Sequence, residues 1–454
     1  GKTTGCTIVV ERMLRSSTLL RGLASKAAGA GKKPTVVFVD GARIPFAQSS
    51  TVYNDYLGVD LQKFAYKGLV DKTALDPKEI DYILGGNVIQ EVRTSNIARE
   101  AAMAAGLPTD IPAHTVVLAC ISSNVGICSA AEKVLTEHAS LVLVGGVETF
   151  SDVPIRLTRP LRQALITLPK AMKKGPLGVF KHLAKLNFKD LGLETPAIAN
   201  YTTGEVMGHS SDRLSAKFGV SRREQDEFAA LSHQRAAKAH KDGIYKDEII
   251  PVDGNTGENG IKGESTADTL AKLKPAFVKP HGTHTAANSS FLSDGASASL
   301  IASEEKALSL GLKPKAFLRA WEFVAVDPFE QLLLGPTYAT AKVLSAAGLT
   351  LADIDVIEIH EAFAGQVLSN IRAMGSDKFA QEYLNRSTKV GDIDMAKTNL
   401  HGGSLSLGHP FAATGNRLVT TAANRLHREG GKYALVTACA DGGLGHACII
   451  ENYE

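Results

Sequence analysis

The chain of 454 residues lacks several features that would assign it to a specialised class of protein. No uninterrupted apolar stretch reaches the roughly 18 residues that a membrane-spanning helix needs, because Gly, Ser, Lys or Asp interrupts each run. The five cysteines are few, irregularly spaced and without a Cys-x-x-Cys pair, so neither a disulfide framework nor a structural zinc site is predicted. The formal net charge of +3 gives no indication of nucleic-acid binding. The composition therefore indicates a globular protein with a large core.

Acidic residues are also absent from Met13 to Val39, where Arg and Lys alternate with Ser and Leu. This composition is typical of a mitochondrial transit peptide, which we place at residues 13–33. A basic tail without a targeting role is the alternative. Because the chain begins with Gly and its first Met is Met13, we expect residues 1–12 to be a non-native leader.

Three sequence patterns recur in the same order in the two halves of the chain. LDPKEIDYI from Leu75 matches LTLADIDVI from Leu349, with Leu, Ile, Asp and Ile at equivalent positions. A helical run followed by an apolar strand then recurs (122–146 and 415–439), as do DGASASLI and GLGHACII (294–301 and 443–450). The second and third patterns are separated by 152 residues in the first half (146 to 298) and by 8 residues in the second half (439 to 447). The first half therefore contains an insertion of about 144 residues.

Strands that alternate with helical patterns predict an α/β fold in which each half is a sheet covered by helices. The N-terminal half is predicted at residues 34–150 and 273–305, the insertion at 151–272, and the C-terminal half at 306–454.

Four reactive side chains follow predicted strands, where α/β proteins gather their chemistry. Cys120 follows the run His114 to Ala119 and precedes a helix, whose N-terminus favours a thiolate. Cys439 and His360 each end a strand, and His409 lies in the glycine-flanked loop GGSLSLGHP. A nucleophilic thiol, a base and a second acid could act together in acyl chemistry. Spacing alone does not show that these groups meet.

The residues from about Pro34 onward resemble the thiolase family, and within it the branch of mitochondrial trifunctional β subunits. The markers are LACISSN, GGVETFSD, SRREQDEFA, GTHTAANSSFLSDGA, LLLGPTYAT, HEAF, GGSLSLGHP and ACADGG. The resemblance implies two duplicated βαβαβαββ halves in five layers (α-β-α-β-α), with a loop subdomain inserted in the first half.

The resemblance also implies roles for individual residues. Cys120 would be the nucleophile that carries the acyl group, His409 its activating base, and Cys439 the acid that protonates the leaving acetyl-CoA. His360 stands where most of the family has an oxyanion-hole Asn, and Ser290 and Phe363 match positions that line the coenzyme A channel. The implied activity is thiolysis of 3-ketoacyl-CoA, long-chain substrates included, by coenzyme A, which is a co-substrate; no resident cofactor or metal is implied.

One position departs from the family pattern. The Cys-x-Gly motif reads Cys439-Ala440-Asp441 here. The N–H groups of Cys120 and of the third motif residue form an oxyanion hole in the family, and Asp441 could still donate its N–H. Its carboxylate is expected to raise the pKa of Cys439 and to oppose the developing oxyanion.

The insertion contains a wholly basic segment, residues 153–189, with nine Lys or Arg and no acidic residue. Leucines and other apolar residues alternate with these charges, and Lys174-Gly175-Pro176 divides the segment into two helical pieces. Such a hairpin suits an anionic membrane surface, for example cardiolipin. A solvated basic face over a core-packed helix is the alternative.

The resemblance places the protein on the matrix side of the mitochondrial inner membrane, as a homodimer core within a hetero-oligomer. Its partner there would be an α subunit that carries hydratase and dehydrogenase activities. Two other functions remain open from the sequence: a ketoacyl synthase-like condensing enzyme, which would not need Cys439, and a non-catalytic scaffold subunit, which Asp441 favours.

Overall fold

The computed structural model describes residues 35–197 and 199–453, so the predicted leader and transit peptide lie outside the described residues. The strands are β1 Val36–Arg43, β2 Ala47–Gln48, β3 Tyr82–Gly86, β4 Ala113–Val116, β5 Leu141–Glu148, β6 Arg156–Leu157, β7 Leu193–Glu194, β8 Ser293–Ser303, β9 Ala316–Ala325, β10 Val356–Ile359, β11 Tyr433–Ala440 and β12 Leu444–Asn452. The α-helices are α2 Gly58–Thr73, α3 Ile97–Ala104, α4 Ser122–Leu135, α5 Arg159–Met172, α6 Gly175–Leu183, α7 Met207–Lys217, α8 Arg222–Lys241, α9 Ala267–Leu270, α10 Glu304–Ser309, α11 Gly335–Ala347, α12 Ala364–Met374, α13 Asp377–Tyr383, α14 Ser404–Leu407 and α15 Thr414–Glu429. Short 3₁₀ helices are η1 Pro77–Glu79, η2 Ala119–Ile121, η3 Phe188–Asp190, η4 Ile244–Asp247, η5 Leu351–Asp353 and η6 Phe411–Ala413.

The strand pairing repeats between the two halves of the chain. The order is β10-β11-β12-β9-β1-β8-β5-β3-β4, with β2 beside β8, so β1-β8-β5-β3 of the first half corresponds to β9-β12-β11-β10 of the second. Ile83 pairs in parallel with Ala113, and Ile357, its counterpart in the second half, makes a parallel bridge with Thr398. The sequence predicted one sheet for each half, whereas β1 and β9 pair at their edges and join the two into one sheet.

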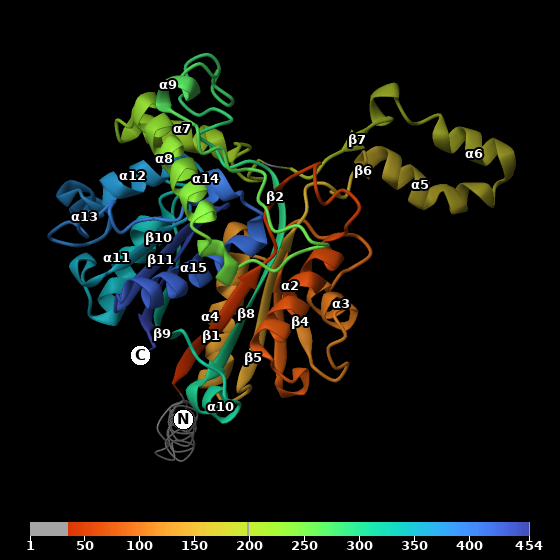
Figure 1. Ribbon diagram of the computed structural model, residues 1–454. Helices are drawn as coiled ribbons and strands as arrows, with labels where there is room; N and C mark the ends of the chain where they lie inside the picture. The colour runs from red at the N-terminus through yellow and green to blue at the C-terminus, as the bar shows by residue number, and fades with distance from the viewer. Residues whose placement is uncertain (1–34, 198, 454) are drawn as a thin grey trace, which may run out of the picture.

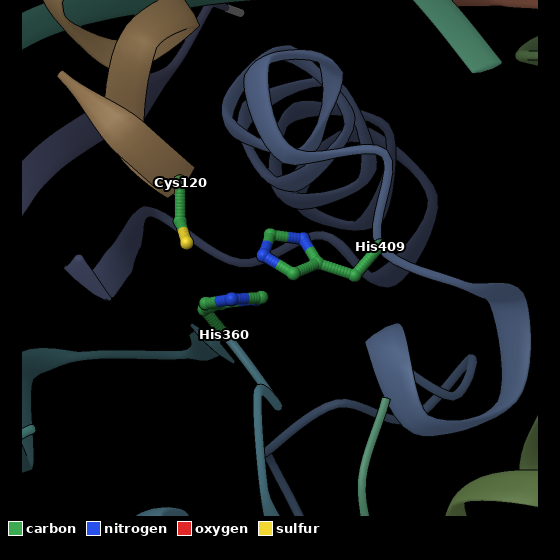
Figure 2. Close-up of side chains that lie close together, drawn as sticks. All are labelled: Cys120, His360 and His409. Carbon is green, nitrogen blue, oxygen red and sulfur yellow. The ribbon is translucent and has the colours of Figure 1, made fainter. Parts of the chain in front are cut away.

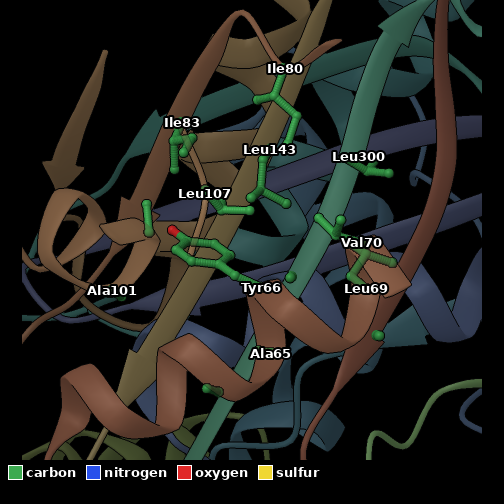
Figure 3. Packing of buried hydrophobic residues seen from close by; sticks show 14 of the residues in the cluster. Ala65, Tyr66, Leu69, Val70, Ile80, Ile83, Ala101, Leu107, Leu143 and Leu300 are labelled. Atoms are coloured by element: carbon green, nitrogen blue, oxygen red, sulfur yellow. The ribbon is translucent and has the colours of Figure 1, made fainter. Parts of the chain in front are cut away.

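Side chains that alternate between the two faces of the sheet contribute to three separate hydrophobic cores. Leu143 of β5 packs with Tyr66 and Leu69 of α2 on the outer face of the first half (Figure 3). The next residue, Val144, faces the central core, which holds side chains of α4 and α15. In the second half, Val436 faces the same central core, and Leu435 packs against α11 and α12 outside. Successive strand residues point to opposite faces, so helices and sheet form five layers, and the predicted α/β class is confirmed.

The two central helices, α4 and α15, touch at their N-terminal ends. The Asn416 N–H donates to Ser123 Oγ at 2.9 Å. A Cβ atom on Gly415 would lie 2.3 Å from Asn124 Oδ1, so only glycine allows this approach. The loops that lead into both helices are thereby brought to one place.

The insertion between β5 and β8 forms two separate structures. Helices α7, α8 and α9 lie over the C-terminal half, and Ser232 of α8 donates to the buried Glu361 at 2.7 Å. The strands β6 and β7 with α5 and α6 form an arm that projects away from the body (Figure 1). Among the described residues, no helix combines the length and apolar character needed to cross a membrane.

Candidate active site

Cys120 lies in the turn between β4 and α4. The strand ends at Val116, earlier than the predicted run to Ala119, because the chain turns at Leu118. Ser122 fixes this turn: its Oγ accepts the Leu118 N–H at 2.9 Å and donates to the Ala119 carbonyl at 2.7 Å. Of the four cysteines in the described part of the chain, Cys120 alone is partly exposed. Cys120 is therefore the residue among these four that lies nearest to the solvent.

His360 and His409 reach the same place from two other elements. His360 follows β10, and its N–H donates to the Thr437 carbonyl at 2.9 Å, which continues the pairing with β11. His409 follows Gly408, whose φ of 102° suits glycine and whose Cβ position would lie 2.5 Å from Ser293 Oγ. The His409 N–H in turn donates to Ser293 Oγ at 2.9 Å.

The structure brings Cys120, His360 and His409 into one cluster. The Cys120 sulfur and one ring nitrogen of each histidine all lie within 4.8 Å of one another. The imidazole rings are tilted against each other with centroids 4.2 Å apart. Figure 2 shows the far ring nitrogen of His409 directed toward the sulfur. The three groups can thus exchange protons and share one ligand.

Each imidazole is held through its Nδ1 atom and leaves Nε2 free. His409 Nδ1 lies 2.7 Å from Thr414 Oγ1, and the Thr414 hydroxyl donates to the Pro410 carbonyl at 3.2 Å. The His409 Nδ1 therefore carries the hydrogen, and its Nε2 is an acceptor. His360 Nδ1 lies 3.1 Å from Ser404 Oγ. Neither Nε2 has a hydrogen-bond partner among residues 35–197 and 199–453.

Burial keeps the three groups uncharged. It lowers the pKa of His409 to about 3, with a smaller contribution from the Arg417 charge. It also lowers the pKa of His360 well below its usual value and raises the pKa of Cys120 to about 12. The prediction of a thiolate favoured by the helix N-terminus was therefore wrong, because desolvation outweighs the two main-chain N–H groups, of Cys120 and Asp441, that stabilise the anion.

Cys439 is the last but one residue of β11, where it pairs with Gly445, and it is 1% exposed. Burial raises the pKa of its thiol, and ionisation of Cys120 would raise it further. Cys439 is not one of the three residues whose ligand atoms share the 4.8 Å cluster. At neutral pH it is a thiol with a proton to give.

Asp441 acts on a different cysteine from the one predicted. Its carboxylate accepts from Asn200 Nδ2 at 3.0 Å and from the Gly442 N–H at 2.7 Å. The charge raises the pKa of Cys120 and is not among the causes of the Cys439 shift. The expected effect on Cys439 was wrong because Asp441 lies beyond the end of β11, and its carboxylate is held toward the turn by Asn200 and the Gly442 N–H.

Neutralising Asp441 should therefore make Cys120 more reactive. We expect Asp441→Ala and Asp441→Gly to keep or raise kcat for thiolysis, and Asp441→Asn, which keeps the shape, to speed alkylation of Cys120 by iodoacetamide a few-fold at pH 7. Rates of alkylation and steady-state kinetics measure both effects. A large loss of kcat in all three variants would show that the carboxylate is needed.

Ser290 and Phe363 lie next to each other, although they are far apart in the sequence. The Ser290 N–H donates to the Ala362 carbonyl at 2.9 Å, and Ser289 forms a bridge with Phe363. The Phe363 ring meets Phe277 and His284 edge to face. Both predicted channel positions thus lie side by side, next to the HEAF segment that carries His360.

Several residues that shape the site carried no role in the sequence analysis. Thr414 and Ser404 orient the two imidazoles, but a single hydroxyl residue gives no signal in a sequence. Glu361 accepts from Ser232, Asn399 and the Leu405 N–H, and so ties α8 to the loops beside both histidines. Its place directly after His360 in HEAF was the one available signal.

A separate cavity of about 380 Å³ lies in the inserted region. It is lined by Glu205, His209, Asp212, Arg213, Ala216, Val220, Val278, His281, Gly282 and Thr283. Asp212 holds His284 at 2.9 Å, and His284 packs on Phe363. The cavity is thus one side chain away from the predicted channel wall, and none of the clustered residues lines it.

Comparison with known proteins supports one family for both halves. Residues 36–305 match the model "Thiolase, N-terminal domain" and residues 312–452 match "Thiolase, C-terminal domain". The mouse "Trifunctional enzyme subunit beta, mitochondrial" is 52% identical over 97% of this chain and 93% of its own length. A Caenorhabditis elegans "Probable 3-ketoacyl-CoA thiolase" is 53% identical over 97% of this chain and 100% of its own.

The fold agrees with solved structures. Human mitochondrial 3-ketoacyl-CoA thiolase superposes with a TM-score of 0.79 at 28% identity, covering 93% of this chain and 100% of that one. The same enzyme in complex with CoA gives a TM-score of 0.79 at 29% identity and covers 93% of this chain and 98% of that one. With both domain models matched and curated relatives above 50% identity along nearly its whole length, the chain belongs to the thiolase family.

Proposed function

We propose that this protein is a 3-ketoacyl-CoA thiolase that cleaves its substrate through an acyl-enzyme on Cys120. The observation that carries the proposal is the cluster of the Cys120 thiol with two neutral imidazoles whose Nε2 atoms have no hydrogen-bond partner among the described residues. A thiol with an adjacent unprotonated base is the arrangement that nucleophilic acyl transfer requires. Two relatives are named for this activity or for the trifunctional enzyme.

In the first half-reaction, His409 Nε2 takes the Cys120 proton as the sulfur attacks the 3-keto carbon. The bond between the α- and β-carbons then breaks, and its electrons leave on acetyl-CoA as an enolate. Cys439 gives its proton to that α-carbon, which yields acetyl-CoA and an acyl group on Cys120. The raised pKa of Cys439 suits this role, because the thiol keeps its proton until a strongly basic carbon forms beside it.

In the second half-reaction, the Cys439 thiolate takes the proton of a new coenzyme A. The resulting thiolate attacks the thioester and releases the shortened acyl-CoA. The Cys120 sulfur recovers its proton from His409, so every group returns to its starting state. The scheme is ping-pong because the first product leaves before the second substrate reacts.

Three donors would stabilise the oxyanions of these steps. The main-chain N–H groups of Cys120 and Asp441 already converge on the Cys120 sulfur. Ser404 Oγ accepts from Arg417 Nη2 at 3.2 Å, which leaves its own hydrogen for His360 Nδ1. We therefore assign the hydrogen of His360 to Nε2, as a donor into the site. Ser290 and Phe363 would line the channel for the pantetheine arm.

A thiolysis assay with acetoacetyl-CoA and with a long-chain 3-ketoacyl-CoA separates the candidate functions. CoA-dependent release of acetyl-CoA is expected, and the ratio of the two rates gives the chain-length preference. Folded protein that cleaves neither substrate would contradict the proposal and favour a scaffold subunit. A condensing enzyme would form acyl-Cys120 but would keep its activity in the Cys439→Ala variant.

We further propose that the protein works in mitochondria with an α subunit that carries the hydratase and dehydrogenase steps. The mouse relative's name, a beta subunit of a mitochondrial trifunctional enzyme, supports this assignment. A homodimer would form the core of that hetero-oligomer. Size-exclusion chromatography with light scattering, with and without such a subunit, tests the assembly.

The arm formed by β6, α5, α6 and β7 is proposed to bind an anionic bilayer on the matrix side of the inner membrane. In α5 only Ala164 and Ala171 are buried, and α6 has no buried residue, which argues against helices packed on the core. Apolar side chains on the arm are exposed, among them Ile166 at 77%, Phe180 at 71% and Phe188 at 91%. Basic residues beside an exposed apolar face are typical of interfacial helices.

Charge reversal on the arm should separate membrane binding from catalysis. We expect Lys173, Lys174, Lys181 and Lys185 changed together to Glu to abolish sedimentation with cardiolipin vesicles, since each basic residue near the surface contributes about 1 kcal/mol. Thiolysis should be unaffected. A control with four exposed lysines of the body changed to Glu (Lys241, Lys246, Lys313 and Lys378) has the same net charge and should still bind. Equal binding by both variants would contradict a role for the arm.

A further inference from the structure

We propose that Cys120, His360 and His409 form a three-ligand site for a borderline-soft divalent cation, Zn²⁺ above all, which reversibly blocks the enzyme. The sulfur and one nitrogen of each ring lie within 4.8 Å of one another. Both Nε2 atoms are buried and have no hydrogen-bond partner in the described part of the chain. Of the three ligand residues, Cys120 is the one with partial exposure to the solvent.

The geometry needs only small adjustments to hold such an ion. Zinc binds thiolate at about 2.3 Å and imidazole at about 2.0–2.1 Å, so its tetrahedral ligand atoms lie roughly 3.3–3.6 Å apart. The present ligand atoms lie within 4.8 Å of one another, so the side chains would have to move together by up to roughly 1.5 Å to hold the ion. One thiolate and two imidazoles form a ligand set that selects Zn²⁺ over Mg²⁺ or Ca²⁺.

The second contact of His409 is that of a metal ligand, and that of His360 becomes so when its ring hydrogen lies on Nδ1. An imidazole that binds a metal through one nitrogen is oriented by a hydrogen bond at the other. His409 Nδ1 is held by Thr414 Oγ1 at 2.7 Å, and His360 Nδ1 by Ser404 Oγ at 3.1 Å. Both Nε2 atoms are thus directed into the cluster before an ion arrives, and His360 binds after its ring hydrogen moves from Nε2 to Nδ1, where Ser404 Oγ accepts it.

Binding of the ion would remove the functions that catalysis needs. The Cys120 thiol releases one proton to the solvent and the sulfur bonds to Zn²⁺, with no change of oxidation state. The His409 Nε2 lone pair bonds to the same ion. Nucleophile and base are then both occupied, while a fourth coordination position stays open to water or to a substrate thiol.

Cobalt substitution tests the site without relying on turnover. Titration of the full chain with Co²⁺ is expected to give, at one equivalent, intense tetrahedral d–d absorption and a thiolate-to-cobalt charge-transfer band. One equivalent of Zn²⁺ should abolish both and protect Cys120 from iodoacetamide, as read by peptide mass spectrometry, and EDTA should restore alkylation. Absence of the charge-transfer band, or alkylation of Cys120 unchanged by Zn²⁺, would overturn the proposal even if thiolysis is found.

Variants locate the ion within the chain. We expect Cys120→Ala to lose the charge-transfer band. His360→Asn should weaken Zn²⁺ binding by at least about 100-fold, because an amide is a poor zinc ligand. That factor is the upper end of the range for losing a residue that hydrogen-bonds to a metal ligand. A double variant of the two exposed cavity histidines, His209→Ala with His281→Ala, should bind as the parent protein does. Full-affinity binding by Cys120→Ala and His360→Asn, or its loss in the cavity variant, would place the ion elsewhere and contradict the assignment.

Discussion

Replacing Cys120 with alanine is expected to lower kcat for thiolysis by about 10⁴-fold or more, the range seen when a catalytic nucleophile is removed. Without the sulfur no acyl-enzyme forms, and the remaining hydrogen-bond donors have no bond-forming step to assist. The steady-state release of acetyl-CoA measures the effect.

Cys128→Ala is the matched control. Cys128 lies further along in α4, is buried, and is absent from the cluster with the histidines. It should keep near-normal turnover, and thermal unfolding should show both variants folded. If Cys120→Ala retained a tenth of the parent activity, the thiol would not be the nucleophile.

Replacing His409 with glutamine is expected to reduce kcat by about 10²- to 10⁴-fold, the usual contribution of a positioned general base. Glutamine keeps a polar side chain but cannot accept the Cys120 proton, so both half-reactions lose their proton carrier. His209→Gln, a change of an exposed histidine, should leave kcat unchanged. Equal activity of both variants would assign the base to another residue.

With His409 as the base, kcat/KM should depend on pH in an unusual way. An ordinary imidazole gains its proton near pH 6.5, and a base with that pKa would lose activity as the pH falls through this value. Burial lowers the pKa of His409 to about 3, so its Nε2 stays unprotonated across the neutral and mildly acidic range. The acid limb of kcat/KM should therefore lie well below pH 6.5. A limb centred at 6.5 would indicate a solvated histidine as the base.

Much of the fold could be predicted because the duplication is visible as matching sequence patterns in the two halves. The alignment that matches Leu75 with Leu349 also matches Ile83 with Ile357, which make equivalent parallel pairs. The break at Lys174–Gly175 likewise separates α5 from α6. The edge pairing of β1 with β9 gave no local signal, because it depends on how the two halves pack.

The site was predictable as a set of residue types and not as an electrostatic environment. Strand ends and glycine-flanked loops pointed to Cys120, His360 and His409, and the fold brings them together. The protonation state of Cys120 was mispredicted because burial comes from residues distant in sequence, and Asp441 acts on Cys120 across a turn. Thr414 and Ser404 were missed because the bonds that orient the imidazoles exist only in the folded chain.

The central claim is a covalent acyl group on Cys120, and mass spectrometry of the protein mixed with a 3-ketoacyl-CoA in the absence of free coenzyme A tests it most directly. We expect one equivalent of released acetyl-CoA and one acyl group, shorter than that of the substrate by the acetyl unit, on the peptide that contains Cys120. Addition of coenzyme A should then remove that group. An acyl group on Cys439 or another residue, or turnover without any acyl-enzyme, would contradict the account.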